Sequence, residues 1–522
     1  MRSFACFTLI LCLLFAGCSR PLPPRDTLRV GLGAEPATLD PHLAQGLAEV
    51  RVLTAIYEGL VLPFPSKTGD VISGGVAHSW QVLENGCKIV FHLRSDAVWS
   101  NDTPVTAQDF VDSWQRALTP SLAAPNAWLF YAIEGAKDFH QGKIEWSRVG
   151  VKATSPTTLV IRLEHPTPTF LQTMTHPIFS PLFNAKNLPT QRGLVWSKPP
   201  GLITNGAFTL IEHKPYEKLT ALKNPRYWGA QNVSLKKIEF YPIDNRSSEE
   251  MAFLSGILDV TLALPLSKVH AYRSDPRLRI DPALQTAYLM VNVRQPPLND
   301  LRVRQALSLS LERSALCKQV LRAGQTPATT FVPPDLNTHL TDDNHDASAN
   351  IPYALHEDLE EARSILNTLP AETRAQMNRL VLKFNTSEAR KLISETLQAQ
   401  WEKNLGLNIT LENLEWKTFL SSRQKGEYDL AQAGWSADSA DPSNFLELFV
   451  SDNPNNSTGW ANAAYDRAVK DRQFAKAEAI LLQELPCIPL YFNPNVYLIS
   501  PRVHGWVPNA MDLHDWRALN VR

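Results

Sequence analysis

Hydrophobic and polar residues alternate with two different periods along this chain. Residues 27–32 read TLRVGL and alternate as a half-buried strand does, whereas residues 46–61 carry apolar residues at helical spacing. Residues 87–94 and 157–163 predict two further strands, each with apolar residues on one face. Between these two strands, a capping-box pattern predicts a helix that begins after Thr106.

The middle of the chain has the pattern of an antiparallel meander. From Asn205 the sequence reads GAFTLIEH, a short turn, KLTALKN and then KKIEFYPI. Three short alternating segments joined by turns predict three strands paired in chain order. Ser247 and Glu250 are then predicted to cap a helix that stops at Gly256.

After about residue 380, predicted strands and helices alternate. A helix over 387–404 ends at Gly406 between two strand patterns, and a second helix ends at Gly426 before the strand pattern YDLAQAGW. Strand–helix–strand units predict a mostly parallel sheet with right-handed crossovers. Ligands of such sheets bind beyond the carboxyl ends of the strands, and Asp438 comes just after one such end.

The N-terminus has the features of a secretory signal. The sequence MRSFACFTLILCLLFAGC places one basic residue before an apolar run that is too short for an ordinary membrane span. The end of this run resembles a bacterial lipobox, in which Cys18 would be lipidated and become the first residue of the mature protein. Phe15 stands where that motif usually has Leu, and an ordinary cleaved signal with an incidental Cys18 is the alternative. The Pro-rich segment that follows predicts a stiff spacer.

Composition narrows the possible functions. A chain of 522 residues is too long for one ordinary core, so two or three domains are expected. Lys and Arg number 51 against 52 Asp and Glu, so the net charge provides no indication of nucleic-acid binding. Beyond the signal and lipobox, the three cysteines allow at most one disulfide, and each lies in an apolar stretch typical of a buried residue: Cys87, Cys317 and Cys487.

Catalytic and metal-binding motifs are missing from the sequence. There is no phosphate-binding glycine loop, no HExxH or zinc-ligand spacing, and no G-x-S-x-G nucleophile motif. Asp438 and Asp441 alone are weak evidence for hydrolysis, because paired acids are easily found in a chain with 52 of them. We therefore expect no catalytic residues, no metal and no cofactor.

Residues 78–120 are the most specific part of the sequence. The segment HSWQVLENGCKIVFHLRSDAVWSNDTPVTAQDFVDSWQRALTP resembles the signature of the extracytoplasmic peptide-binding proteins of ABC importers, the oligopeptide- and dipeptide-binding group. The resemblance continues through NGAFTL, NPRYW, SGILD, DLRVRQALSLSLER and CIPLYF, and it covers nearly all of the chain from Thr27 onward. It implies an α/β fold with two hinged lobes, mostly parallel sheets and an extra α+β domain, closing over a peptide.

This resemblance also implies a division of the chain. The expected segments are a signal peptide (1–17), a lipidated N-terminus and linker (18–26), a first lobe (27–60, 200–290 and 497–522), an extra domain beside it (61–199) and a second lobe (291–496). Hinge strands are expected near 199–205, 287–293 and 494–500.

The resemblance places the ligand-holding acid in a GW-x-x-D segment, which is GWSAD here. It implies that Asp438 pairs with the peptide α-ammonium, a charge-assisted hydrogen bond that contributes about 1.5–3 kcal/mol. A loop cap is the alternative for Asp438, and Asp441, in front of a proline, is interpreted as a turn former.

Main-chain capture is expected to accompany the ammonium contact, because strand addition binds a peptide without reading its side chains. Trp416 matches a family position that walls a side-chain pocket, although ordinary helix packing would also explain it. The residues implied for main-chain and pocket contacts are Gly434, Trp435, Ser436, Trp416, Ala34 and Glu35.

The peptide carboxylate requires a cation. Arg390, in FNTSEAR, stands where relatives place a carboxylate-binding residue, and Arg423 matches a second cation of oligopeptide carriers. Arg suits bidentate recognition of a carboxylate, although either residue could instead lie on a helix surface. Gln432 replaces a further family arginine, which removes one recognition point.

These implications lead to one functional hypothesis with alternatives. We expect a non-enzymatic, monomeric receptor for short peptides, lipid-anchored at the outer face of the cytoplasmic membrane. Its partners would be permease subunits and, through them, ATPase subunits, with no nucleic acid. The alternatives are a carrier of murein-derived peptides, a carrier of haem or a nickel chelate, or an extracytoplasmic peptide-acting enzyme or chaperone.

Overall fold

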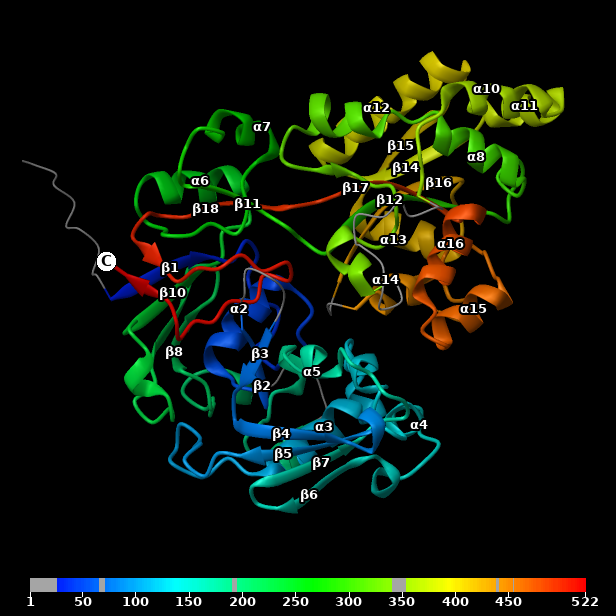
Figure 1. Ribbon diagram of the computed structural model, residues 1–522. Helices are drawn as coiled ribbons and strands as arrows, with labels where there is room; N and C mark the ends of the chain where they lie inside the picture. The colour runs from blue at the N-terminus through cyan, green and yellow to red at the C-terminus, as the bar shows by residue number, and fades with distance from the viewer. Residues whose placement is uncertain (1–25, 65–70, 190–194, 340–353, 438–440, 454) are drawn as a thin grey trace, which may run out of the picture.

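The computed structural model shows helices packed around several separate β-sheets (Figure 1). It describes residues 26–64, 71–189, 195–339, 354–437, 441–453 and 455–522. The expected signal sequence, Cys18 and Asp438 lie outside these ranges. The combination of sheets and covering helices confirms the predicted α/β class.

The β1 sheet, named after its first strand, has four strands in the order β1-β10-β9-β8. Its strands pair antiparallel from β8 to β10, which confirms the predicted meander, and β1 adds to β10 in parallel. Its core also takes in the helix α2 and residues near the C-terminus, among them Trp516 and Val521. The bounds are β1 (Thr27–Gly31), α2 (Leu47–Ile56), β8 (Phe208–Lys214), β9 (Lys218–Lys223) and β10 (Lys237–Tyr241).

The helix after this meander begins two residues earlier than predicted. The helix α6 spans Arg246–Leu254, and its N-cap is Asn245, whose Oδ1 accepts a hydrogen bond from the Ser248 backbone N at 2.9 Å. The predicted cap at Ser247 and Glu250 is therefore wrong. Glu250 is instead buried and accepts a hydrogen bond from the Tyr272 hydroxyl at 2.7 Å. Asn is as good a cap as Ser, so the local pattern could not choose between the two.

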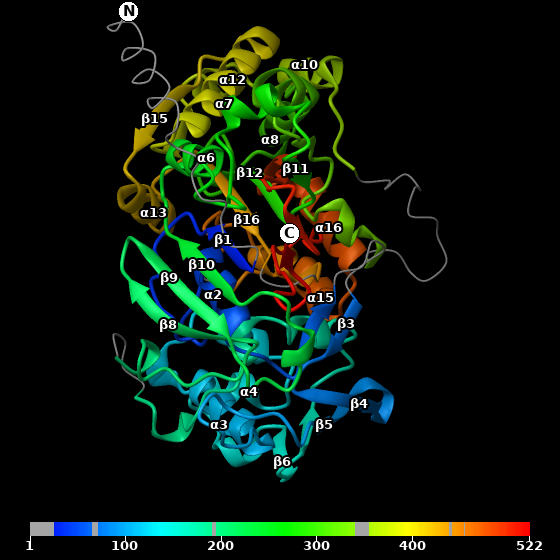
Figure 2. The same ribbon diagram turned by 90° about the vertical axis from the view of Figure 1, so that its left-hand side faces the viewer.

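The β4 sheet has four antiparallel strands in the order β4-β5-β7-β6 and lies below β8, β9 and β10 in the turned view (Figure 2). Against it packs the helix α3, which has the predicted capping box between Thr106 and Asp109. Buried Trp114 of this helix contacts Phe130 and Phe179 in one aromatic core. The bounds are β4 (Ala77–Leu83), β5 (Lys88–Leu93), α3 (Ala107–Leu118), β6 (Val151–Ser155) and β7 (Thr158–Arg162).

The β12 sheet has six strands in the order β13-β17-β12-β16-β14-β15. Only β14 pairs in parallel, with β15 and β16, and the other three pairings are antiparallel. The prediction of mostly parallel sheets is therefore corrected to mixed sheets. The bounds are β12 (Gln285–Val291), β13 (Thr326–Pro327), β14 (Val381–Asn385), α12 (Glu388–Leu405), β15 (Thr410–Leu414), α13 (Trp416–Lys425), β16 (Leu430–Ser436) and β17 (Cys487–Phe492).

The chain passes between the β1 and β12 sheets along two paired segments. β11 (Leu278–Asp281) pairs antiparallel with β18 (Asn495–Leu498), and each continues directly into a strand of the β12 sheet (Figure 1). The crossings are therefore at 282–284 and 493–494. The hinge expected near 287–293 overlaps β12, which has strand partners on both sides, so the crossings lie just before it. The expected boundaries after residues 290 and 496 likewise fall inside β12 and β18.

Shorter elements complete the fold. Cys317 and Cys487 are buried, Cys87 is half-buried, and none of these three forms a disulfide. None of the described helices is long and apolar enough to span a membrane. The remaining elements are β2 (Val61–Phe64), β3 (Val71–Gly74), α4 (Ala136–His140), α5 (Phe170–Thr173), α7 (Leu266–Val269), α8 (Leu301–Leu309), α9 (Arg313–Ala315), α10 (Leu359–Thr368), α11 (Ala371–Met377), α14 (Ser443–Leu446), α15 (Ala463–Lys470), α16 (Phe474–Glu484), β19 (Val503–His504) and β20 (Asn520–Val521).

Candidate functional site

The strand β16 has one unpaired backbone edge. It pairs with β12 along its whole length from Leu430 to Ser436, but on its other side β14 pairs only with Leu430 and Ala431. Among the described residues, the edge from Gln432 to Ser436 has no strand partner on that side. Gly434 and Ser436 are exposed there. An unpaired strand edge of this kind can accept an extended chain through main-chain hydrogen bonds.

Two arginines lie beside this edge without an acidic partner. Arg390 is in the first turn of α12, and its Nη2 is 3.8 Å from the position that a Cβ on Gly434 would occupy. Arg423 is in the last turn of α13, and its buried Nε has no hydrogen-bond partner. Neither guanidinium forms an ion pair with any described carboxylate. The two charges are therefore uncompensated by the described part of the protein.

The surroundings of these arginines are aromatic rather than acidic. Burial lowers the pKa of Arg390 below its usual value, and the positive charge of Arg423 adds to this effect. Burial raises the pKa of the neighbouring Tyr288, and both guanidinium groups act against that rise. Both cations thus act on Tyr288, which pairs with Ala433 of β16, and an anion bound near this residue would be stabilised by both.

Gln432 holds Arg390 in place, so this residue has a structural role in addition to removing one arginine from ligand recognition. The Gln432 side chain is buried, and its Nε2 donates hydrogen bonds to the Arg390 carbonyl at 2.8 Å and to the Ser394 Oγ at 2.6 Å. The Arg390 Nη1 lies 3.4 Å from the Gln432 Oε1. A neutral amide therefore fixes the first turn of α12, where an arginine would add a third like charge.

The two tryptophans of the expected site have different environments. Trp435 is half-buried, and its Nε1 donates a hydrogen bond to the Asn444 Oδ1 at 3.0 Å. Trp416 begins α13, is 50% exposed and stacks on Phe419 with ring centroids 6.1 Å apart. An indole that is half exposed is available to a ligand, although its stacking on Phe419 also fits the alternative of helix packing.

Glu35 and Ala34 lie on the other side of the chain crossings, beside the β1 sheet. The Glu35 carboxylate accepts hydrogen bonds from the His213 Nε2 at 2.7 Å and from the Tyr216 backbone N at 2.9 Å. Its charge is therefore engaged by the β8–β9 hairpin. Ala34 is exposed and offers main-chain groups only.

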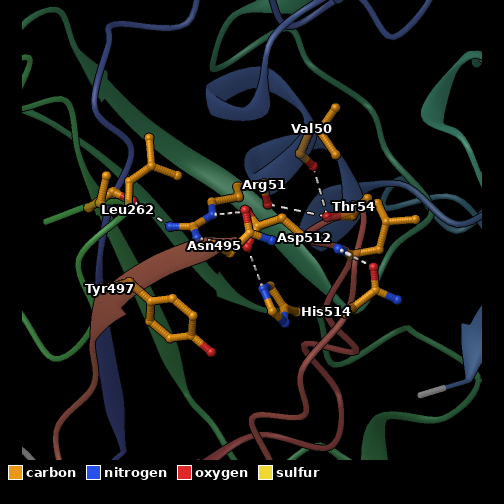
Figure 3. Close-up of polar contacts among 12 residues, drawn as sticks. Val50, Arg51, Thr54, Leu262, Asn495, Tyr497, Asp512 and His514 are labelled. Carbon is orange, nitrogen blue, oxygen red and sulfur yellow. Dashed lines mark hydrogen bonds and ion pairs between the residues drawn. The ribbon is translucent and has the colours of Figure 1, made fainter. Parts of the chain in front are cut away.

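A buried charge network, which the sequence did not indicate, positions the segment that contains these two residues. The Arg51 Nη1 donates a hydrogen bond to the Gly31 carbonyl at 2.8 Å, at the end of β1. Figure 3 shows Arg51 with its other partner, Asp512. The same guanidinium binds both carboxylate oxygens of Asp512, at 2.7 and 3.0 Å. Asp512 also contacts the His514 Nε2 at 2.9 Å. Although burial alone would raise the pKa of Asp512, Arg51 and His514 hold it well below its usual range.

Asp441 does more than form a turn. Its Oδ1 accepts a hydrogen bond from the Ser443 backbone N at 2.8 Å, as a turn former's would. Its Oδ2 also accepts hydrogen bonds from the Thr169 hydroxyl and, at 2.7 Å, from the Arg472 Nη2. Asp441 is therefore a buried junction between residues distant in the sequence.

A group that could bind a metal lies away from these residues. His356, Asp358 and Glu361 place their ligand atoms within 4.8 Å of one another. Asp358 already caps α10 through its Oδ1, which accepts a hydrogen bond from the Glu361 backbone N at 2.8 Å. His356 and Glu361 are exposed, as ordinary surface residues are.

Comparison with known proteins identifies the family. Residues 71–457 match the model of the bacterial extracellular solute-binding proteins, family 5 Middle. The chain belongs to this family. The periplasmic oligopeptide-binding protein OppA of Salmonella typhimurium is 33% identical over 506 residues, which cover 93% of this chain and 90% of OppA. The periplasmic murein peptide-binding protein MppA of Escherichia coli is 34% identical over 492 residues, covering 91% and 89%.

A solved structure supports the same assignment. The Escherichia coli murein tripeptide binding protein MppA superposes with a TM-score of 0.79 at 33% identity, covering 96% of this chain and 99% of that one. The periplasmic-binding-protein fold implied by the sequence is thereby confirmed. Membership of a family 5 solute-binding group also confirms an extracytoplasmic binding protein rather than an enzyme.

Proposed function

We propose that this family 5 protein is the peptide-binding receptor subunit of an ABC importer. The observation that carries the proposal is the uncompensated cation Arg390 beside the unpaired edge of β16, with the second uncompensated cation, Arg423, close enough to act on it. A peptide supplies both complements, since its main chain can pair with the edge and its terminal carboxylate can neutralise the cations. Oligopeptide-binding relatives support this reading, at up to 33% identity.

Both ends of the ligand are proposed to be held. Asp438, in the GWSAD segment, would bind the α-ammonium, with Trp435, Ser436, Ala34 and Glu35 near the main chain and Trp416 beside a side chain. Asp438 follows Gly434 by four residues, so their Cα atoms are at most about 14 Å apart. A peptide held by Asp438 and by the cation beside Gly434 is therefore short.

The domain organisation follows from the same proposal. The β1 and β12 sheets would be the cores of the two lobes, with the β4 sheet as the extra domain and the crossings at 282–284 and 493–494 as hinges. In the closed receptor, Glu35 and Ala34 would face β16 from the other lobe. The closed receptor would deliver its cargo to permease subunits served by ATPase subunits.

Other cargoes remain as alternatives to nutrient peptides. MppA is named for murein peptides, and the Escherichia coli relative YgiS, 33% identical over 501 residues, is named as a probable deoxycholate-binding protein. A bile acid, haem or nickel chelate could place carboxylates on the arginines but offers no ammonium to Asp438. Asp438 therefore favours a ligand with a free amino group, which nutrient and murein peptides share.

Native mass spectrometry of the protein purified from its own host tests the proposal. We expect mass increments that match short peptides, with the protein releasing them intact after denaturation. Calorimetry with trialanine on the refolded protein should then show binding in a one-to-one ratio. Recovery of a ligand without peptide bonds, or cleavage of the added peptide by the pure protein, would overturn the proposal.

The lipid anchor is proposed from the lipobox-like end of the signal. We expect Cys18→Ser to move the protein from the membrane fraction to the soluble extracytoplasmic fraction, with unchanged affinity for trialanine. A terminus that carries several acyl chains stays in the membrane, whereas one chain binds only marginally. Cys87→Ser is the matched control and should leave the protein in the membrane. Membrane retention of the Cys18 variant would contradict the anchor.

A further inference from the structure

Asp441 joins two parts of the molecule that are far apart in the sequence. Thr169, the residue before α5, donates its hydroxyl hydrogen bond to the Asp441 Oδ2 across 272 positions. The same oxygen accepts a hydrogen bond from Arg472 at 2.7 Å. The Asp441 side chain is 5% exposed, so this is an enclosed contact and not a surface ion pair. In Figure 1, α5 lies below α14, and the contact joins the segments that precede these two helices.

Each side of the contact is attached to a hydrophobic core. Phe170 follows Thr169, is buried and packs edge-on against Phe179 in the core of the β4 sheet. Phe445, in α14, is buried against Phe331 in a core of the β12 sheet, with ring centroids 6.1 Å apart. Packed side chains hold both Thr169 and Asp441 in place. The contact between them therefore depends on the relative position of the two cores and not on local loop movement.

The contact is also linked to the strand edge proposed to bind the ligand. Asn444 donates its backbone N–H to the Asp441 carbonyl at 3.0 Å, and its side-chain Oδ1 accepts the hydrogen bond from Trp435. Trp435 lies in β16, between Gly434 and Ser436. The turn that Asp441 holds is therefore the one that fixes the indole of the ligand-facing strand.

Movement between the two cores would break this contact. Two chain crossings, at 282–284 and 493–494, join the β12 sheet covalently to the rest of the described chain. A rotation about these crossings moves Asp441 away from Thr169, while Arg472 and Ser443 move with Asp441 because they belong to the same core. Of the hydrogen bonds given above for the Asp441 carboxylate, the one from Thr169 is then the one that depends on how the two cores are placed.

We propose that Asp441 is a positioning residue of the ligand site, and that Thr169 makes the domain built on the β4 sheet (the β4 domain) a clamp that holds the closed receptor around its ligand. The statement that the clamp retains the ligand rests on the proposed function. The statement that Thr169 holds the two cores together does not. The β4 domain would then take part in binding without touching the ligand. Loss of the Thr169 hydroxyl would remove one donor from a buried carboxylate, and the closed state would become less populated.

Distance measurements on the ligand-free protein test the clamp directly. Spin labels at Lys152→Cys on β6 and Lys476→Cys on α16, both exposed positions, would report the separation of the two cores in a protein carrying Cys87→Ser. We expect Thr169→Val to add a longer-distance population in double electron–electron resonance, and Thr169→Ser to restore the wild-type distribution. Thr173→Val is the matched control, because its hydroxyl bonds only the Thr169 carbonyl, at 3.2 Å. Identical distributions for wild type and Thr169→Val would overturn the proposal.

Dissociation kinetics test the consequence for the ligand. With trialanine as the probe, we expect Thr169→Val to raise the dissociation rate about tenfold or more, the usual effect of losing a hydrogen bond to a charged group. Thr169→Ser and Thr173→Val should dissociate at the wild-type rate. An unchanged rate for Thr169→Val would overturn ligand retention by the clamp. If the wild type does not bind trialanine, the proposed function fails, and the distance measurement still decides the clamp.

Discussion

Replacing Asp438 with Asn is expected to weaken binding of peptides with a free N-terminus while the protein stays folded. The bound ammonium would then face a neutral amide, and loss of one partner of a desolvated charge pair costs about 2–5 kcal/mol. That range corresponds to about thirtyfold to several thousandfold in affinity. N-acetylated peptides lack the ammonium, so they should bind poorly to the wild type and lose little more in the variant.

Calorimetry tests this prediction on four combinations: wild type or variant protein, each with the free or the acetylated peptide. Together they form a double cycle that isolates the contact between Asp438 and the ammonium. Asp452→Asn is a matched control, because Asp452 is an exposed acid. It should leave both affinities unchanged. Equal losses for free and acetylated peptides would show that Asp438 does not contact the ammonium and is only a loop acid.

Replacing Arg390 with Met should have two opposite effects. Affinity for peptides with a free C-terminus should fall by about thirtyfold to several thousandfold, because a buried carboxylate would lose a cationic partner worth about 2–5 kcal/mol. Thermal unfolding of the ligand-free variant should occur at the same temperature as the wild type or higher. The reason is that Arg390 is desolvated without a described acidic partner, so removing its charge removes a cost of folding.

Arg313 provides the contrast for this experiment. It is a buried arginine whose guanidinium donates hydrogen bonds to the Pro489 and Ser308 carbonyls, at 2.8 and 3.0 Å, and to the Ser308 Oγ. Arg313→Met should therefore lower the unfolding temperature, because it leaves buried acceptors without a donor. For Arg390→Met, amidated peptides should lose little affinity. Equal losses for amidated and free peptides, or unfolding as early as Arg313→Met, would contradict the role of Arg390.

Local patterns were sufficient for most individual elements. The capping box before α3, the meander of β8 to β10 and the glycine that ends α12 each depend on residues within a few positions of one another. The cap of α6 was misplaced because Asn245 and Ser247 are both good caps. The mixed β12 sheet was missed for a longer-range reason. The chain enters this sheet at β12 and leaves it after β17, through the two crossings. These crossings, and not the local strand–helix–strand units, set the directions of β12 and β17.

The amino-acid sequence was also sufficient for the family, since a signature over 78–120 is carried by residue identities that can be read directly. It could not show which charged residues have partners. Arg51 meets Asp512 across 461 positions and Thr169 meets Asp441 across 272, whereas Arg390 and Arg423 meet no described acid. A charge that is neutralised inside the protein supports the fold, and one that is desolvated without a partner is available to a ligand. Only the folded chain decides between these two cases, because it alone brings distant residues together and excludes water from them.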